Sequence, residues 1–246
     1  MLNLPWDPAA LPVVVLLVGA TIVYSLMHYL FAQPRLQARF EAKGIDAINA
    51  QELAVVFRRI RGGSLLLFGM LGVELLAGRP LFETLAAVPG PTTVAWVGGS
   101  LAVLAPILWL SGRGAQVQAA QPESRNPVQS PTRILGGWAA WALYLLGYEY
   151  LFRGALLFGL AATLGAWPAL AITTAIYALV HLPKPMLGET LGSIAMGFVF
   201  GAMALDTGTI WAPWLVHMGI VIVTEVSAGR HNPAIAWWAT GDSPQE

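Results

Sequence analysis

Residues 147–154 read Gly147-Tyr148-Glu149-Tyr150-Leu151-Phe152-Arg153-Gly154, and they place two opposite charges inside an apolar run from about Ile134 to Trp167. No other residue in that run is charged. A charge at bilayer depth costs roughly 2.5–3.5 kcal/mol on insertion scales, so it persists only when it is paired or functional. Because residues i and i+4 share a helix face, Glu149 and Arg153 can neutralise each other. The pattern predicts a buried ion pair, which could brace the helix or take part in chemistry.

The composition is that of a membrane protein. Of the 246 residues, 57% are hydrophobic and 11% are charged, whereas a soluble domain carries about 25% charged residues. The chain has no cysteine, which excludes disulfides, thiolate metal ligands and a cysteine nucleophile. The first apolar stretch, about residues 9–32, follows no basic segment and is long enough to span a bilayer. It predicts a retained helix and not a cleaved leader.

Apolar segments of about twenty residues predict an all-α, polytopic membrane helical bundle of about seven transmembrane helices. The fourth segment is too long for one perpendicular crossing, so it should tilt or break near Gly154. The predicted spans lie near residues 9–32, 62–78, 92–111, 134–160, 167–182, 189–205 and 209–228.

Four parts follow from this pattern. Residues 1–111 form an N-terminal three-helix part, and residues 112–133 are polar, contain proline and predict a mobile cytoplasmic loop. Residues 134–228 form a helical core with every candidate site residue, and residues 229–246 form a C-terminal tail. No internal repeat is visible, so an inverted-repeat transporter receives no support.

Lysine and arginine predict the orientation of the chain in its membrane. Eleven of the 13 fall on one side of the predicted spans, Arg79 falls on the other side, and Arg153 lies within a span. Such an excess marks the cytoplasmic side. We therefore expect an integral membrane protein of a bacterial-type inner (cytoplasmic) membrane, with its N-terminus outside and its C-terminus in the cytoplasm.

The polar residues of the core form three motifs on successive apolar segments. They are Glu149-x-x-x-Arg153, Tyr177-x-x-x-His181, and a third segment that contains His217. Motifs of zinc proteases, serine hydrolases and P-loop enzymes, namely H-E-x-x-H, G-x-S-x-G and the Walker loop, are absent from the sequence.

The order and spacing of these motifs resemble the CAAX protease and bacteriocin-processing family of intramembrane endopeptidases, also called Abi proteins. That family carries a Glu-Glu-x-x-x-Arg helix, an aromatic-x-x-x-His helix and a His-x-x-x-Asn helix. The resemblance covers roughly residues 134–228 and includes the run from Thr207 to Trp214 that leads into the third motif.

The resemblance implies an integral-membrane endopeptidase that cleaves a peptide bond of a membrane-associated substrate with a water activated by Glu and His. The implied catalytic residues are Glu149, His181, His217, Arg153 and Tyr148. The implied partners are membrane lipid and a membrane-associated peptide or protein, and no nucleic acid. The cofactor stays open between a divalent metal, held by His181 and His217, and none.

Two positions depart from the family pattern. Tyr148 stands where the family has its first Glu, and Val221 stands where it has Asn. With a phenol pKa near 10, Tyr148 is a poor base at neutral pH, although it could donate a hydrogen bond to an oxyanion. Glu225 could replace part of the lost ligand or lie at the cytoplasmic helix end. These departures favour an alternative, a catalytically impaired family member that acts as a membrane binding or scaffold protein.

Burial sets expectations for the remaining polar residues. Isolated polar groups facing lipid are costly, so we expect Glu149, Arg153, His181 and His217 to meet in one interior cavity. His181 falls near the end of its span, unless the Pro183–Pro185 segment re-enters the membrane. Glu74 is expected to snorkel to the outer interface, Tyr177 to serve in packing, and His231 to be solvated.

Overall fold

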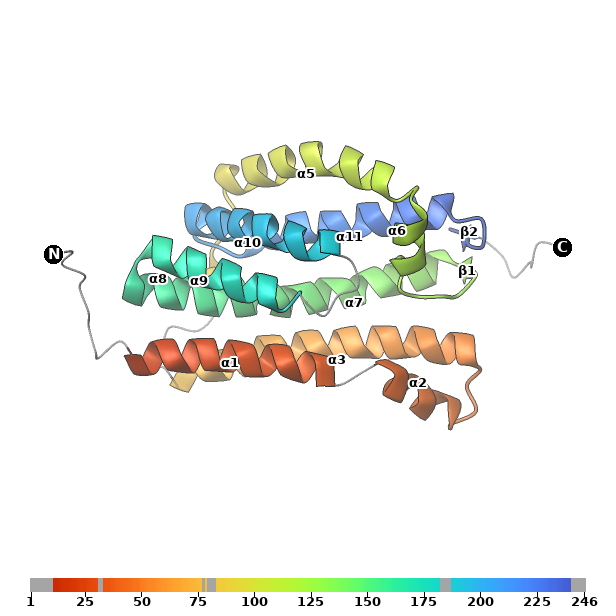
Figure 1. The fold of residues 1–246 in the computed structure, drawn as a ribbon, viewed down its shortest axis with the longest axis horizontal. Coiled ribbons are helices and arrows are strands. Elements are labelled where there is room, and N and C mark those ends of the chain that lie inside the picture. Colours follow the sequence, from red (N-terminus) through yellow and green to blue (C-terminus); the bar gives the residue numbers. More distant parts are fainter. Residues whose placement is uncertain (1–10, 31–32, 77, 79–82, 182–186, 240–246) are drawn as a thin grey trace. The chain divides into compact units, whose positions relative to one another are not determined.

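The computed structural model describes residues 11–30, 33–76, 78, 83–181 and 187–239. Within these residues the regular structure is helical apart from two strands of two residues each, and turns and loops connect the helices (Figure 1). In chain order the elements are α1 (Leu11–Leu30), α2 (Gln33–Glu41), α3 (Ala47–Leu76), α4 (Glu83–Ala86), α5 (Pro91–Ser111), α6 (Ala115–Ala120), β1 (Val128–Gln129), α7 (Pro131–Glu149), the π-helix η2 (Tyr150–Leu157), α8 (Phe158–Leu164), α9 (Ala166–Leu179), α10 (Leu187–Thr207), α11 (Trp211–His231) and β2 (Ala236–Trp237).

The predicted all-α membrane fold is confirmed. Among the residues that the structure describes, three helical runs are long and apolar enough to cross a bilayer, namely Pro91–Ser111, Pro131–Leu164 and Trp211–His231. Shorter apolar helices occupy Leu11–Met27, Ala166–Leu179 and Leu191–Thr207. The predicted span at residues 62–78 overlaps the second half of α3, which is one continuous helix from Ala47.

Local sequence signals fix several helix ends. Asp46 precedes α3, and its carboxylate accepts hydrogen bonds from the backbone and side-chain N–H groups of Asn49, as an N-cap does. Ser130 and Pro131 open α7 in the usual cap and first-turn positions. Gly165, between α8 and α9, has φ +86°, a conformation that glycine adopts without strain.

The first of two compact units contains Met1–Met27, Leu65–Val94 and Gly147–Pro213. In it α9 packs against both α8 and α10 (Figure 1). Glycines on α10 permit this approach, because a Cβ on Gly201 would lie 2.3 Å from Leu170 Cδ1 of α9. A Cβ on Gly197 would lie 3.1 Å from the Tyr177 ring. Small residues thus allow these apolar helices to pack closely.

The second unit contains His28–Ser64, Ala95–Leu146 and Trp214–Glu246. Its strands β1 and β2 pair in parallel, with Val128 opposite Ala236 (Figure 1). Segment 112–133, predicted as a mobile loop, contains α6 and β1 and so has regular structure that the sequence analysis missed. His231 is also not a solvated tail residue. It ends α11, its Nδ1 lies 2.8 Å from the Ser227 carbonyl oxygen, and its ring packs edge-on against Trp109.

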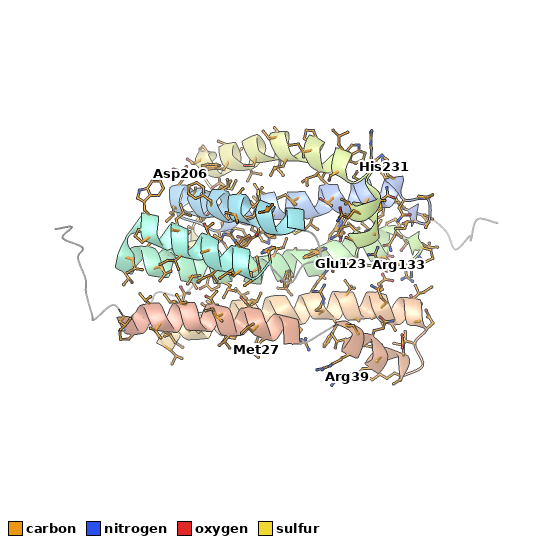
Figure 2. The ribbon with its side chains drawn as sticks, in the orientation of Figure 1. Met27, Arg39, Glu123, Arg133, Asp206 and His231 are labelled. Carbon is orange, nitrogen blue, oxygen red and sulfur yellow. The ribbon has the colours of Figure 1, made fainter. Side chains whose placement is uncertain are left out.

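Glu123, in the segment between α6 and β1, anchors that segment to α3. Its carboxylate lies 2.8 Å from Arg58 Nη2 and 2.9 Å from Arg59 Nη2. Arg133, at the start of α7, pairs with Glu52 of α3 in a second link. Figure 2 shows Glu123 and Arg133. Two separate ion-pair contacts therefore hold the polar segment to one helix.

Arg59 connects this anchor to a buried carboxylate on α11. Its Nη2 lies 3.4 Å from Glu225 Oε1, and its guanidinium carbon lies 4.0 Å from the centroid of the Trp141 ring. The indole N–H groups of Trp141 and Trp138 donate to the two oxygens of Glu225 at 2.9 and 3.0 Å. The Glu225 carboxylate is thus built into a structural network of the second unit.

We expect Glu123→Gln to destabilise the protein at neutral pH by about 1.5–3 kcal/mol, the usual contribution of hydrogen bonds to a charged group. Burial raises the pKa of Glu123, but the charges of Arg59 and Arg58 outweigh it and hold the pKa below the ordinary value of 4.5. The stabilisation is therefore present above the unfolded-state pKa and is lost as the pH falls through the lower folded-state pKa.

Thermal unfolding in detergent at a series of pH values measures this effect. The wild-type and Glu123→Gln curves should differ at pH 7 and approach each other as the pH falls below 4.5. Glu41→Gln, which removes the same charge from an exposed position, serves as the control. A stability difference that does not change with pH anywhere in the acid range would contradict the assignment.

Candidate active site

A π-helix begins between the two charged residues of the fourth apolar segment, so that Glu149 precedes it and Arg153 lies within it. Helix α7 ends at Glu149, and the following eight residues, all of them buried, form η2. The predicted break near Gly154 does not occur, because the helical run continues from Pro131 to Leu164. A Cβ on Gly154 would lie 2.7 Å from the Tyr150 ring and 3.1 Å from Thr84 Oγ1. Glycine is therefore needed in this turn, and π turns inside α-helices are frequent at functional sites.

Glu149 and Arg153 form the buried ion pair that their spacing predicts. Arg153 Nη1 lies 3.1 Å from Glu149 Oε2, and both side chains are 0% exposed. The guanidinium carbon lies 4.3 Å from the centroid of the Tyr177 ring and 5.2 Å from that of Phe200. Aromatic faces attract a desolvated cation. The arginine is therefore stabilised by an anion and by two rings from α9 and α10.

Tyr148 occupies the next face of the helix, and it shares the Tyr177 ring with Arg153. Its ring centroid lies 5.6 Å from Tyr177 and 6.4 Å from His181, and the Tyr177 and His181 centroids are 4.7 Å apart. Phe152, one turn after Tyr148, lies 4.8 Å from it and 5.2 Å from Tyr177. Four rings thus meet beside the ion pair, and one of them, the His181 imidazole, can accept a proton.

A hydrogen bond to the backbone fixes the tautomer of His181. The residue directly follows the last turn of α9 and is buried, and its Nδ1 lies 2.8 Å from the carbonyl oxygen of Tyr177. A carbonyl only accepts hydrogen bonds, so Nδ1 carries the proton. The lone pair of the neutral ring is then on Nε2, the atom that can take a proton from water or bind a metal.

The first unit brings four of the five predicted catalytic residues together, namely Tyr148, Glu149, Arg153 and His181. His217 lies on α11 in the second unit, and its meeting with the other four stays a prediction. So does the metal pair of His181 and His217. Within the ranges that the structure describes, no three His, Asp or Glu side chains are grouped as a metal site. The Pro183–Pro185 segment lies outside those ranges.

Glu74 corrects one expectation of the sequence analysis. It does not snorkel to an interface, because it is 4% exposed and accepts a hydrogen bond from the Tyr150 hydroxyl. One feature of the sequence could have indicated this burial. Glu74 is the only charged residue in the apolar stretch 62–78, just as Glu149 and Arg153 are the only charged residues in the run from Ile134 to Trp167. Tyr177 was expected to serve in packing alone, and it also binds His181 through its carbonyl and Arg153 through its ring.

Residues 130–223 match the family model described as type II CAAX prenyl endopeptidase Rce1-like. The matched range contains all five residues that the sequence analysis assigned to catalysis. It agrees with the family that the three motifs predict. Comparison with curated proteins and with solved structures gave no match.

We expect Arg153→Met to destabilise the protein by about 3–5 kcal/mol, because removal of one partner leaves a buried charge uncompensated. The double variant Glu149→Gln with Arg153→Met removes both charges and should recover much of that loss. The free energies of unfolding in detergent of the wild type, Glu149→Gln, Arg153→Met and the double variant give the coupling energy of the pair. Additive losses would show that Glu149 and Arg153 do not stabilise each other.

Proposed function

Because residues 130–223 match the Rce1-like model of type II CAAX prenyl endopeptidases, we propose that this integral membrane protein cleaves a peptide bond of a membrane-associated substrate through its Tyr148–His181 face. The observation that carries this proposal is the contact of the His181 ring with Tyr148 and Tyr177, next to the Glu149–Arg153 pair. On this face the His181 imidazole can accept a proton, and the Tyr148 hydroxyl can donate a hydrogen bond.

His181 is the general base of the proposed reaction. Water is a poor nucleophile until a base removes its proton. With Nδ1–H donating to the Tyr177 carbonyl, a neutral His181 ring carries its lone pair on Nε2, and the proposed reaction places that proton there. As the water oxygen bonds to the substrate carbonyl carbon, its proton passes to Nε2, and the same proton then goes to the leaving amine as the C–N bond breaks.

Tyr148 is the proposed donor to the oxyanion of the tetrahedral intermediate. Its ring lies against His181, and its hydroxyl can donate one hydrogen bond where the carbonyl oxygen becomes negative. A preorganised donor of this kind typically contributes 10²–10³-fold to a rate. A tyrosine in place of the family's first glutamate can thus stabilise the oxyanion formed during peptide-bond cleavage.

Glu149 and Arg153 hold the reacting face in position. The Glu149 carboxylate is fully buried and lies against a guanidinium, which favours His181 over Glu149 as the group that takes the proton. Glu149 supplies a fixed negative charge near the reacting groups, while Arg153 links η2 to α9 and α10 through aromatic contacts. The family resemblance also implies a catalytic role for His217 of α11.

The second candidate function is a catalytically impaired family member that binds or scaffolds membrane partners. Packing of the Tyr148 ring against Tyr177 and His181 favours it, since an aromatic ring there takes the place of a carboxylate. The two candidates differ in whether the wild-type protein turns over a peptide substrate.

In proteoliposomes with a membrane-anchored peptide, we expect His181→Ala to lower kcat/KM by about 10²–10⁴-fold through loss of the base. Tyr148→Phe should lower it by about 10²–10³-fold through loss of the hydroxyl donor. His231→Gln, which changes a histidine at the end of α11, is the control and should retain activity. Thermal unfolding of each variant separates loss of chemistry from loss of fold.

The pair Tyr148→Glu with Val221→Asn restores the family pattern and tests the second candidate. If the wild type is inert toward every peptide and this double variant cleaves, the scaffold function is supported and the role of Tyr148 as a donor is wrong. If the wild type cleaves and Tyr148→Phe cleaves equally fast, the hydroxyl of Tyr148 has no part in the reaction.

A further inference from the structure

Glu74 of α3 and Tyr150 of η2 form a buried contact that the proposed reaction does not use. Their exposed fractions are 4% and 1%, and the Tyr150 hydroxyl donates a hydrogen bond to Glu74 Oε2. Glu74 is the only charged residue of the apolar stretch 62–78. An ionisable side chain at membrane depth is costly and is kept where it has a partner and a function. The contact is therefore a candidate for a role in the site.

The Tyr150 ring lies over the following turn of η2. A Cβ on Gly154 would lie 2.7 Å from Cδ2 of that ring and 3.0 Å from its Cε2. The ring thus covers Gly154, four residues further along the chain, while the hydroxyl at its far end is bound to Glu74. One side chain therefore runs along the first half of the π-helix and ties it to α3.

Helix α4 contacts the same turn. The Cβ position on Gly154 lies 3.1 Å from Thr84 Oγ1, and the Thr84 carbonyl accepts a hydrogen bond from the backbone N–H of Ile210 at 3.3 Å. These residues, together with Glu74 and Tyr150, belong to the first unit. The start of the π-helix is thus in contact with α3 through the Tyr150 side chain and with α4 through Thr84.

The π-helix determines how Arg153 is directed relative to the residues before it. Backbone hydrogen bonds of a π turn join residues five apart, whereas those of an α-helix join residues four apart. Side chains within η2 are therefore rotated about the axis relative to a continued α-helix. Tyr148 and Glu149 precede η2, and Arg153 lies within it. Because π turns are rare, contacts with other elements are needed to hold one, and the contact of Tyr150 with Glu74 is of this kind.

We propose that Glu74 is a positioning residue of the candidate site, which binds Tyr150 and so maintains the π-helix that directs Arg153 toward Glu149 and the Tyr177 ring. The role of this arrangement in peptide-bond cleavage rests on the proposed function. The arrangement itself can be measured without a substrate, because the 3.1 Å contact of Arg153 with Glu149 has a coupling energy. A contact that served packing alone would add stability and leave that coupling energy unchanged.

The first test measures the coupling energy of Glu149→Gln and Arg153→Met again in a Tyr150→Phe background, from free energies of unfolding of the full chain in detergent. Tyr150→Phe removes only the hydroxyl that reaches α3, and the coupling energy should lose most of its wild-type value. Tyr24→Phe is the matched control, because its ring also packs against α3, where a Cβ on Gly69 would lie 2.6 Å from Tyr24 Cζ. It should leave the coupling energy unchanged. An unchanged coupling energy in the Tyr150→Phe background would overturn the proposal.

Amide hydrogen exchange gives a second readout, which covers the case in which the multiple variants do not fold. In the Tyr150→Phe single variant the amides of η2 should exchange faster than in the wild type, because the π-helix has lost its link to α3. Tyr24→Phe should leave the exchange of η2 unchanged. Equal exchange of η2 in the wild type and in Tyr150→Phe would overturn the proposal.

Activity in proteoliposomes tests the role in the reaction. Misplacement of reacting groups by about 1 Å can lower a rate by about 10²-fold, so Glu74→Leu should lower kcat by up to about that factor and change KM little. Glu74→Gln keeps an oxygen that accepts the Tyr150 hydroxyl and should restore most of kcat.

The outcomes separate this proposal from the proposed function. If the wild type cleaves the peptide and folded Glu74→Leu has the wild-type kcat, Glu74 is not a positioning residue, while the proposed function stands. If the wild type cleaves no peptide, the proposed function fails, and the coupling energy and the hydrogen exchange still decide whether Glu74 directs Arg153.

Discussion

The pairing of Glu149 with Arg153 is the constraint on which the site depends. Neither charge is stable alone in an apolar run, and their separation of four residues lets one helix neutralise both. The pair in turn fixes which faces of η2 remain for other groups. Arg153 faces the rings of Tyr177 and Phe200, so the charge that balances Glu149 also connects three helical segments of the first unit.

The second unit also contains a buried arginine, Arg59, and stabilises it through different contacts. Arg59 meets two carboxylates and lies over an indole ring, and both oxygens of Glu225 receive N–H donors from tryptophans. Arg153 has one carboxylate and aromatic faces. Arg59 donates hydrogen bonds from both of its Nη atoms, although its Nε has no hydrogen-bond partner. Directional bonds of this kind restrain the geometry of the network. An arginine balanced by one anion and by π faces is held with less directional restraint.

The sequence predicted features that depend on residues a few positions apart, and it did not predict contacts between distant segments. The Glu149–Arg153 pair, the His181 position at a helix end and the helical class follow from patterns within a few residues. Glu74 could not be placed, because its partner Tyr150 is 76 residues away. Segment 112–133 could not be recognised as anchored, because Glu123 meets Arg59 across 64 residues. A polar, non-periodic sequence carries no local sign of such a contact.

The substitution at position 148 is consistent with the division of the helix into two faces. Glu149 and Arg153 share one face, while Tyr148 and Phe152 share the next and contact Tyr177 and His181. A carboxylate at position 148 would lie on the aromatic face, away from the side that Arg153 shares with Glu149. Because position 148 is half-buried, its charge would lose part of its contact with water. The phenol avoids that cost and keeps an O–H group beside the imidazole. In the proposed reaction the proton acceptor and the oxyanion donor are neutral side chains, and the buried charges position them.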